Sequence, residues 1–170
     1  MLGFLFRALT AEPARGAALF DALTAEARRP HWYVEGAVPD TLDGRFAVLA
    51  TIVALAIVRL ERDGDCGNSA SVALTERFIE VMESEHRELG IGDPGLGRTV
   101  RKLVRSLARR TELWRAALNP AVDVFEATRG SLYKDNAPTV AVRHSADSLN
   151  AFSERLFATQ LDGLEQGKIA

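Results

Sequence analysis

The sequence has little of what stabilises a small secreted or metal-binding protein. Only one of its 170 residues, Cys66, is a cysteine, which excludes an internal disulfide framework and a cysteine-based zinc site. Neither sign of charge is in clear excess, since the chain has 21 Lys and Arg residues and 23 Asp and Glu residues. The net charge of −2 therefore does not draw the whole chain to nucleic acid or anionic lipid, and an electrostatic partner must recognise a local patch.

The sequence also lacks an apolar run long enough to cross a membrane. Its longest run, Phe46 to Val58, is interrupted only by Thr51. As a helix this run would rise about 20 Å, against a hydrocarbon core of about 30 Å. We therefore expect a helix at the centre of the fold, which the other helices cover on every side or leave open along one flank as an apolar groove.

The first residues lack the features of a targeting sequence. No positive region precedes the apolar start, and Glu12 and Asp21 come too early for an acid-poor mitochondrial presequence. We expect a cytoplasmic protein of bacterial type, which could lie at the cytoplasmic face of the inner membrane. Residues 1–12 would be a flexible or peripheral segment that either anchors at a membrane or packs on its own core. Four of its apolar residues have helical spacing: Leu2, Leu5, Phe6 and Leu9.

Helical periodicity accounts for most of the remaining chain. Pro13 opens a helical stretch that stops at Arg28 to Pro30. Later helices are predicted from Ser71 to Leu89, from about Leu96 to Leu118, from about Ala121 to Arg129 and from about Ser148 to Leu164.

Two segments between these helices are predicted to be irregular. Gly64 to Asn68 resembles a loop, and Asn136 to Ser145 contains a strand-like patch at Thr139 to Val142. One such patch cannot build a sheet. The sequence therefore predicts an all-α, single-domain bundle of about six to eight helices around Phe46 to Val58.

No catalytic or cofactor motif occurs in the context that its chemistry requires. Gly90, Gly92 and Gly95 match the dinucleotide fingerprint, and Gly92 to Thr99 approaches a phosphate-binding loop, but both motifs need a preceding strand and the second needs a lysine. Glu83 to His86 is half of a di-iron motif without its second half. We predict no enzymatic activity, no cofactor and no small-molecule substrate.

Histidine spacing likewise gives no metal pair. His31, His86 and His144 are far apart, and none has a histidine three or four residues away. We therefore predict no metal site.

Charge is distributed unevenly between two predicted helices. Residues 98–115 contain seven basic residues and one acidic residue, a local net charge of +6, whereas residues 76–93 carry −4. The two helices could neutralise each other across a hairpin, or the basic surface could face an anionic membrane or ribosomal RNA. The basic surface comprises Arg98, Arg101, Lys102, Arg105, Arg109 and Arg110.

Two long segments resemble a known family, the ubiquinol–cytochrome c chaperones (Cbp3-like). The first runs from Val38 to Phe46, and the apolar helix that follows it ends Val58-Arg-Leu60. The second runs from Phe78 to Asp93 and includes Arg-Glu-Leu-Gly-Ile-Gly-Asp. Arg110, Trp114 and Leu118 stand where the family carries an arginine, an aromatic residue and a leucine, and the ending Gln166 to Ala170 is similar to bacterial members.

The resemblance implies a helical assembly chaperone that binds newly synthesised cytochrome b and assists biogenesis of the ubiquinol–cytochrome c reductase (bc1) complex. It implies no cofactor and no catalytic residue. The residues through which it would act lie in the two motifs: Asp40, Asp43, Gly44, Arg45, Phe46, Arg87, Glu88, Gly90, Gly92 and Asp93. Arg45 could pair with Asp40, Asp43 or Glu88, or contact the client.

The sequence also departs from the family at several positions. Ile52 stands where many members have a histidine, Ala47 where an aspartate is common and His86 where a leucine is usual. Leu107 to Arg110 replaces a common Phe-Tyr-Gly-Arg. The chain is therefore identified as a divergent member of the family. The residues alone also allow an alternative function, a helical adaptor that binds the ribosome, RNA or an anionic membrane through its basic helix.

Overall fold

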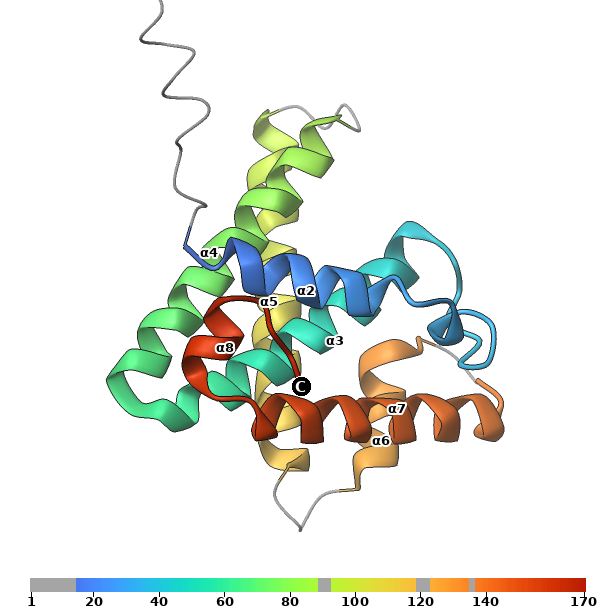
Figure 1. Ribbon diagram of the computed structural model, residues 1–170. Coiled ribbons are helices and arrows are strands. Elements are labelled where there is room, and N and C mark those ends of the chain that lie inside the picture. Colours follow the sequence, from blue (N-terminus) through green and yellow to red (C-terminus); the bar gives the residue numbers. More distant parts are fainter. Residues whose placement is uncertain (1–14, 89–92, 119–122, 135–136) are drawn as a thin grey trace, which may run out of the picture.

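The computed structural model describes residues 15–88, 93–118, 123–134 and 137–170, all of them in helices or their connections (Figure 1). Gly90, Gly92 and the segment 1–12 lie outside the described residues. The described α-helices are α2 (Ala17–Ala27), α3 (Leu42–Leu60), α4 (Gly64–Glu88), α5 (Asp93–Ala117), α6 (Val124–Leu132), α7 (Thr139–Ala158) and α8 (Leu161–Glu165). Two 3-10 helices, η1 (Pro30–Trp32) and η2 (Glu61–Asp63), precede and follow α3. The all-α prediction is confirmed.

Helix α3 is the centre of the fold. Thr41 caps its first turn by accepting a hydrogen bond from the Gly44 backbone N–H at 3.2 Å. From Val48 to Leu60 every residue except Leu49 is buried, and the hydroxyl of the buried Thr51 donates to the Ala47 carbonyl at 2.7 Å. The predicted apolar helix is therefore confirmed and extended at both ends. None of the described helices is long and apolar enough to span a bilayer.

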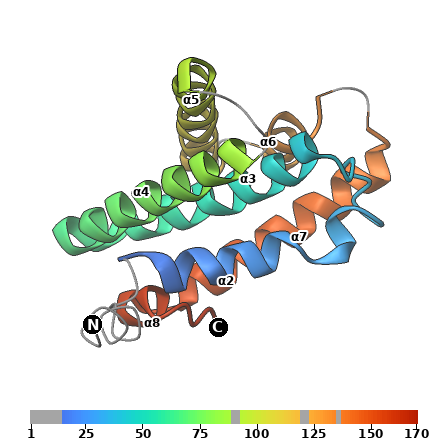
Figure 2. The same ribbon diagram turned by 90° about the horizontal axis from the view of Figure 1, so that it is seen from above.

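Helices on both sides cover α3. Viewed from above, α2, α7 and α8 lie on one side of it, and α4 and α5 lie on the other (Figure 2). Helices α2, α4, α5, α6 and α7 all contact α3. One hydrophobic core cluster receives side chains from all seven α-helices, including Leu23 of α2, Phe78 of α4, Trp114 of α5 and Leu164 of α8.

Helices α4 and α5 run side by side, and one end of the pair extends past α2 (Figure 1). Each has 25 residues and is therefore about 37 Å long. The predicted loop at Gly64 to Asn68 is wrong, because α4 begins at Gly64, and Ser71 lies inside the helix rather than capping it. A Cβ atom at Gly67 would lie 1.9 Å from the Leu60 carbonyl oxygen, so this glycine permits close packing on the end of α3 rather than a loop.

The predicted irregular segment after Asn136 is also wrong, because α7 begins at Thr139. Val142, Ala146 and Leu149 are buried at helical spacing, and Val140, which the alternating pattern made strand-like, is 81% exposed on the opposite face. The predicted last helix is two helices, because the backbone is extended at Thr159 and Gln160 between α7 and α8. Helix α6 begins after Asp123, whose carboxylate accepts from the Phe125 N–H at 2.9 Å.

Candidate functional site

A cleft of about 1200 Å³ opens between α2, the segment from Pro30 to Asp40, the first half of α3 and the second half of α4. Leu103 of α5 completes its lining. Both sequence motifs contribute to it. Asp40, Asp43, Arg45 and Phe46 come from the first motif, and Glu88 comes from the second. The fold thus brings half of the predicted site residues together in one concave surface.

Apolar side chains form much of this lining. Two of the lining residues, Phe46 and Phe20, pack against the buried ring of Phe78. The centre of the Phe78 ring lies 6.1 Å from that of Phe46 and 6.5 Å from that of Phe20. Val34 and Leu42 also line the cleft, and they are 72% and 59% exposed. Exposed large apolar residues beside a concavity are typical of a surface that another molecule covers. The apolar residues of the lining are Phe20, Ala27, Tyr33, Val34, Leu42, Phe46, Leu49, Val81, Met82 and Leu103.

Charged residues also line the cleft, with five carboxylates and three guanidinium groups. Arg45 Nε donates to Asp40 Oδ1 at 2.6 Å, so of the three carboxylates considered as partners Asp40 is the one that pairs with it. This hydrogen bond holds the pKa of the Asp40 carboxyl below its usual range and raises the pKa of Arg45. Asp43 pairs with Lys134. The charged residues are Asp21, Asp40, Asp43, Glu85, Glu88, Arg28, Arg45 and Arg77.

Two predicted site residues, Gly44 and Arg87, are not among the residues that line the cleft. Gly44 is buried in the first turn of α3, where a Cβ atom would lie 1.9 Å from the Pro39 carbonyl oxygen. The absence of a side chain at Gly44 therefore allows the Pro39 carbonyl to lie directly against the first turn of α3. Arg87 is exposed and does not line the cleft. Asp93 is the first residue of α5.

The cleft wall also contains polar atoms that sequence spacing did not indicate. Among the described residues, Thr24 Oγ1 and Arg77 Nε are buried and have no hydrogen-bond partner. Buried polar groups are normally satisfied, so the Thr24 hydroxyl is free to donate or accept a hydrogen bond and the Arg77 Nε–H to donate one. The sequence did not indicate them, because Thr24 lies in α2 and Arg77 in α4, and only the fold places both residues on the cleft.

The predicted basic surface on α5 separates into two parts. Arg98, Arg101, Lys102, Arg105 and Arg109 are exposed. Arg110 does not belong to this surface, because its guanidinium donates to the Ser131 carbonyl at 2.7 Å and lies 5.9 Å from the centre of the Phe46 ring. Burial lowers the pKa of Arg110 to about 10. Helical position explains the correction, since Arg110 follows Arg109 by 100° and faces α6 instead of solvent.

The described part of the hairpin shows no ion pair between an α4 carboxylate and these exposed cations. Arg77 pairs with Glu80 inside α4 at 2.8 Å, and Arg115 pairs with Glu61 of η2 and with Glu112. Mutual neutralisation across the hairpin, one of the two alternatives, therefore has no contact to support it among these residues.

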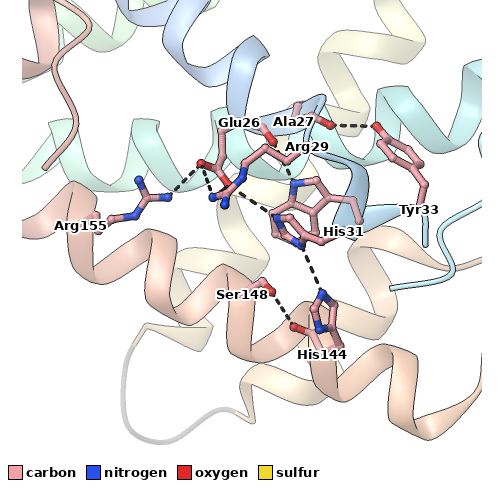
Figure 3. Close-up of polar contacts among 9 residues, drawn as sticks. Glu26, Ala27, Arg29, His31, Tyr33, His144, Ser148 and Arg155 are labelled. Atoms are coloured by element: carbon pink, nitrogen blue, oxygen red, sulfur yellow. Dashed lines mark hydrogen bonds and ion pairs between the residues drawn. The ribbon is translucent and has the colours of Figure 1, made fainter. Parts of the chain in front are cut away.

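A polar cluster outside the cleft joins the two histidines that are farthest apart in sequence (Figure 3). His31 Nδ1 lies 3.2 Å from His144 Nε2, and His31 Nε2 lies 4.0 Å from Glu26 Oε1. Glu26 also accepts from Arg155 Nη2 at 2.9 Å. Sequence spacing missed this pair because 113 residues separate its members. Within the described ranges, no group of three or more His, Cys, Asp or Glu side chains is arranged to hold a metal ion.

Comparison with known proteins identifies the family. The family model described as ubiquinol–cytochrome C chaperone matches residues 35–164, which is most of the chain. The chain belongs to the ubiquinol–cytochrome c chaperone family. No curated protein matches it.

A solved structure shares the fold of this chaperone. The crystal structure of the Cbp3 homolog from Brucella abortus superimposes with a TM-score of 0.73 at 27% sequence identity. The alignment covers 100% of this chain and 96% of the other chain. The match therefore extends over α2 and η1, which supply one wall of the cleft and precede the residues that the family model matches.

Proposed function

We propose that this chaperone binds newly synthesised cytochrome b and holds one of its apolar segments in the cleft during assembly of the ubiquinol–cytochrome c reductase complex. The observation that carries the proposal is the position of Val34 and Leu42. Both are exposed apolar side chains on a concave surface that the two family motifs build together. A membrane protein before insertion exposes apolar segments, and covering them is the task of such a chaperone.

The physical basis of binding is burial of apolar surface, worth roughly 25 cal/mol per Å² removed from water. Ordering a flexible client segment opposes this gain, so binding is reversible and the client can be released to the membrane. The charged side chains among the apolar lining residues keep the cleft hydrated when no client is bound, which limits association between copies of the chaperone. The role needs neither catalysis nor a cofactor.

A photo-reactive amino acid placed at Leu42 or Val34 tests the proposal in cells that synthesise cytochrome b. Both positions should give crosslinks to cytochrome b. Val140 offers a matched control, because it is equally apolar, 81% exposed and located on α7 away from the cleft lining. Crosslinks of equal strength from Val140, or none from Leu42 and Val34, would refute a client site in the cleft.

Substitution at the same positions gives the functional readout. Val34→Asp combined with Leu42→Asp should reduce the haem absorbance of the assembled complex without changing the thermal unfolding of the purified chaperone, because both side chains are exposed. Val140→Asp should leave the complex unchanged. A normal level of complex in a deletion strain would disprove the role in assembly itself.

A further inference from the structure

Five basic side chains lie along one face of α5, the exposed basic face. Successive residues of an α-helix are turned by about 100°, so these five side chains fall within an arc of about 100° over a length of about 16 Å. All five are exposed. The exposed basic face consists of Arg98, Arg101, Lys102, Arg105 and Arg109.

The orientation of this face follows from the packing of the opposite side of α5. Leu107 and Trp114, at 3% and 0% exposure, turn toward the core. The Trp114 Nε1–H donates to Ser131 Oγ at 3.0 Å, which fixes the rotation of the helix about its axis. The exposed basic face is therefore held in solvent by the same contacts that build the core.

No ion pair within the described residues neutralises the positive charge of this face. In the described part of the chain, none of the five cations has an ion-pair partner. The next side chain along this face, Glu112, pairs with Arg115, and Arg115 also pairs with Glu61. The whole chain has a net charge of −2, so the positive charge of this face is a local property of α5.

We propose that the exposed basic face of α5 binds the surface of an anionic phospholipid bilayer. Each lysine or arginine near such a surface contributes a similar increment of binding, and a straight row of cations can place all its charges against a plane at once. The face carries no exposed aromatic side chain, since the only aromatic residue of α5 is the buried Trp114. Single-stranded RNA is usually held by stacking on aromatic side chains, so this surface fits phospholipid headgroups better than single-stranded RNA.

Binding in this way would place the cleft next to the membrane. Leu103, which lines the cleft, directly follows Lys102 on α5. A helix with its side chains is about 10–12 Å across, so the α5 wall of the cleft would lie about one helix diameter from the headgroups. Binding of the membrane by this face does not require a client in the cleft.

Flotation of the full chain with vesicles of phosphatidylcholine and phosphatidylglycerol tests the proposal. The protein should float with these vesicles, remain free with pure phosphatidylcholine, and be released as salt rises. The triple variant Arg101→Gln, Lys102→Gln and Arg105→Gln should bind more weakly by on the order of 100-fold, about fivefold for each lost charge. Arg129→Gln, Arg143→Gln and Lys168→Gln remove the same charge from exposed positions on other elements and should change binding little.

Thermal unfolding of each variant shows that the fold is retained. Absence of flotation with anionic vesicles, or an equal loss in both triple variants, would overturn the assignment of this face. Tight binding of a single-stranded RNA oligomer that the first triple variant abolishes, with no vesicle binding, would replace the lipid by RNA and also overturn it.

Discussion

His31 Nδ1 lies 3.2 Å from His144 Nε2, so a single hydrogen bond between two imidazoles joins η1 to α7. Only one of the two facing nitrogens can carry a proton, because two N–H groups would oppose each other. Desolvation, followed by the charges of Arg29 and His144, lowers the pKa of His31 from its usual 6.5, against the opposing effects of Glu26 and Glu35.

This geometry predicts stability that depends on pH. A lowered histidine pKa means that the unfolded chain binds the proton more readily, so the contribution is fully present above pH 6.5 and is lost as the pH falls through the folded-state pKa. His31→Asn keeps a polar group near Nδ1 and removes the titration. Thermal unfolding temperatures measured in a pH series should fall less steeply below pH 6.5 for this variant than for the parent protein. Parallel curves would show that His31 does not contribute.

Gly44→Ala should destabilise the protein. The new Cβ would lie 1.9 Å from the Pro39 carbonyl oxygen, so the backbone before α3 must shift, at a cost of about 1–3 kcal/mol. The midpoint of urea unfolding measures this loss. Gly97→Ala is the matched control, because the space around Gly97 is open for 4 Å and the position is helical. It should stabilise the protein by about 0.5–1 kcal/mol, and a loss of stability there would contradict the description of α5.

Arg109 and Arg110 are neighbours in sequence with opposite surroundings, and their alanine variants should differ. Arg110→Ala leaves the carbonyl of the buried Ser131 without its donor, which should cost about 1.5–3 kcal/mol. Arg109→Ala removes an exposed side chain and should change the free energy of unfolding by no more than about 0.5 kcal/mol. Equal effects in urea unfolding would show that Arg110 is not held as described.

Arg59 connects the end of α3 to the junction of α7 and α8. Its Nη2 donates to the Thr159 carbonyl at 2.8 Å and its Nη1 to Asp63 Oδ2 at 2.6 Å, and the residue is only 7% exposed. Arg59→Ala should lower the free energy of unfolding by about 1–3 kcal/mol because the Thr159 carbonyl loses its partner. Asp63→Asn should cost less than about 1 kcal/mol, since the Asp63 side chain is 31% exposed. Hydrogen exchange at the start of α8 should increase in the first variant only.

These residues also show which parts of the fold the sequence could predict. The apolar run from Phe46 to Val58 identified the central helix because long-range burial leaves a continuous hydropathy signal. Arg59 directly follows that run and is itself buried. Its burial depends on the carbonyl of Thr159, 100 residues later, and no local pattern contains that information.

The same limit explains the errors at helix starts. Glycine and asparagine at positions 64 to 68 predicted a loop, but Gly67 is required by the approach of the Leu60 carbonyl. At the candidate site, Asp40, Arg45 and Phe46 of the first motif line the cleft, and their contact with a client stays a prediction. The α2 wall of the cleft was not predicted, because Phe20 and Thr24 carry only the ordinary periodicity of an amphipathic helix.

The position of α3 has a consequence for the order of events during synthesis. Four of the helices that contact it, α4, α5, α6 and α7, follow it in the chain. A ribosome that adds residues in sequence therefore releases the most apolar helix long before Ala158 completes α7, and non-local packing of this kind forms late in folding. The chaperone must pass through a stage in which its own central helix is uncovered, the condition in which its proposed client reaches it.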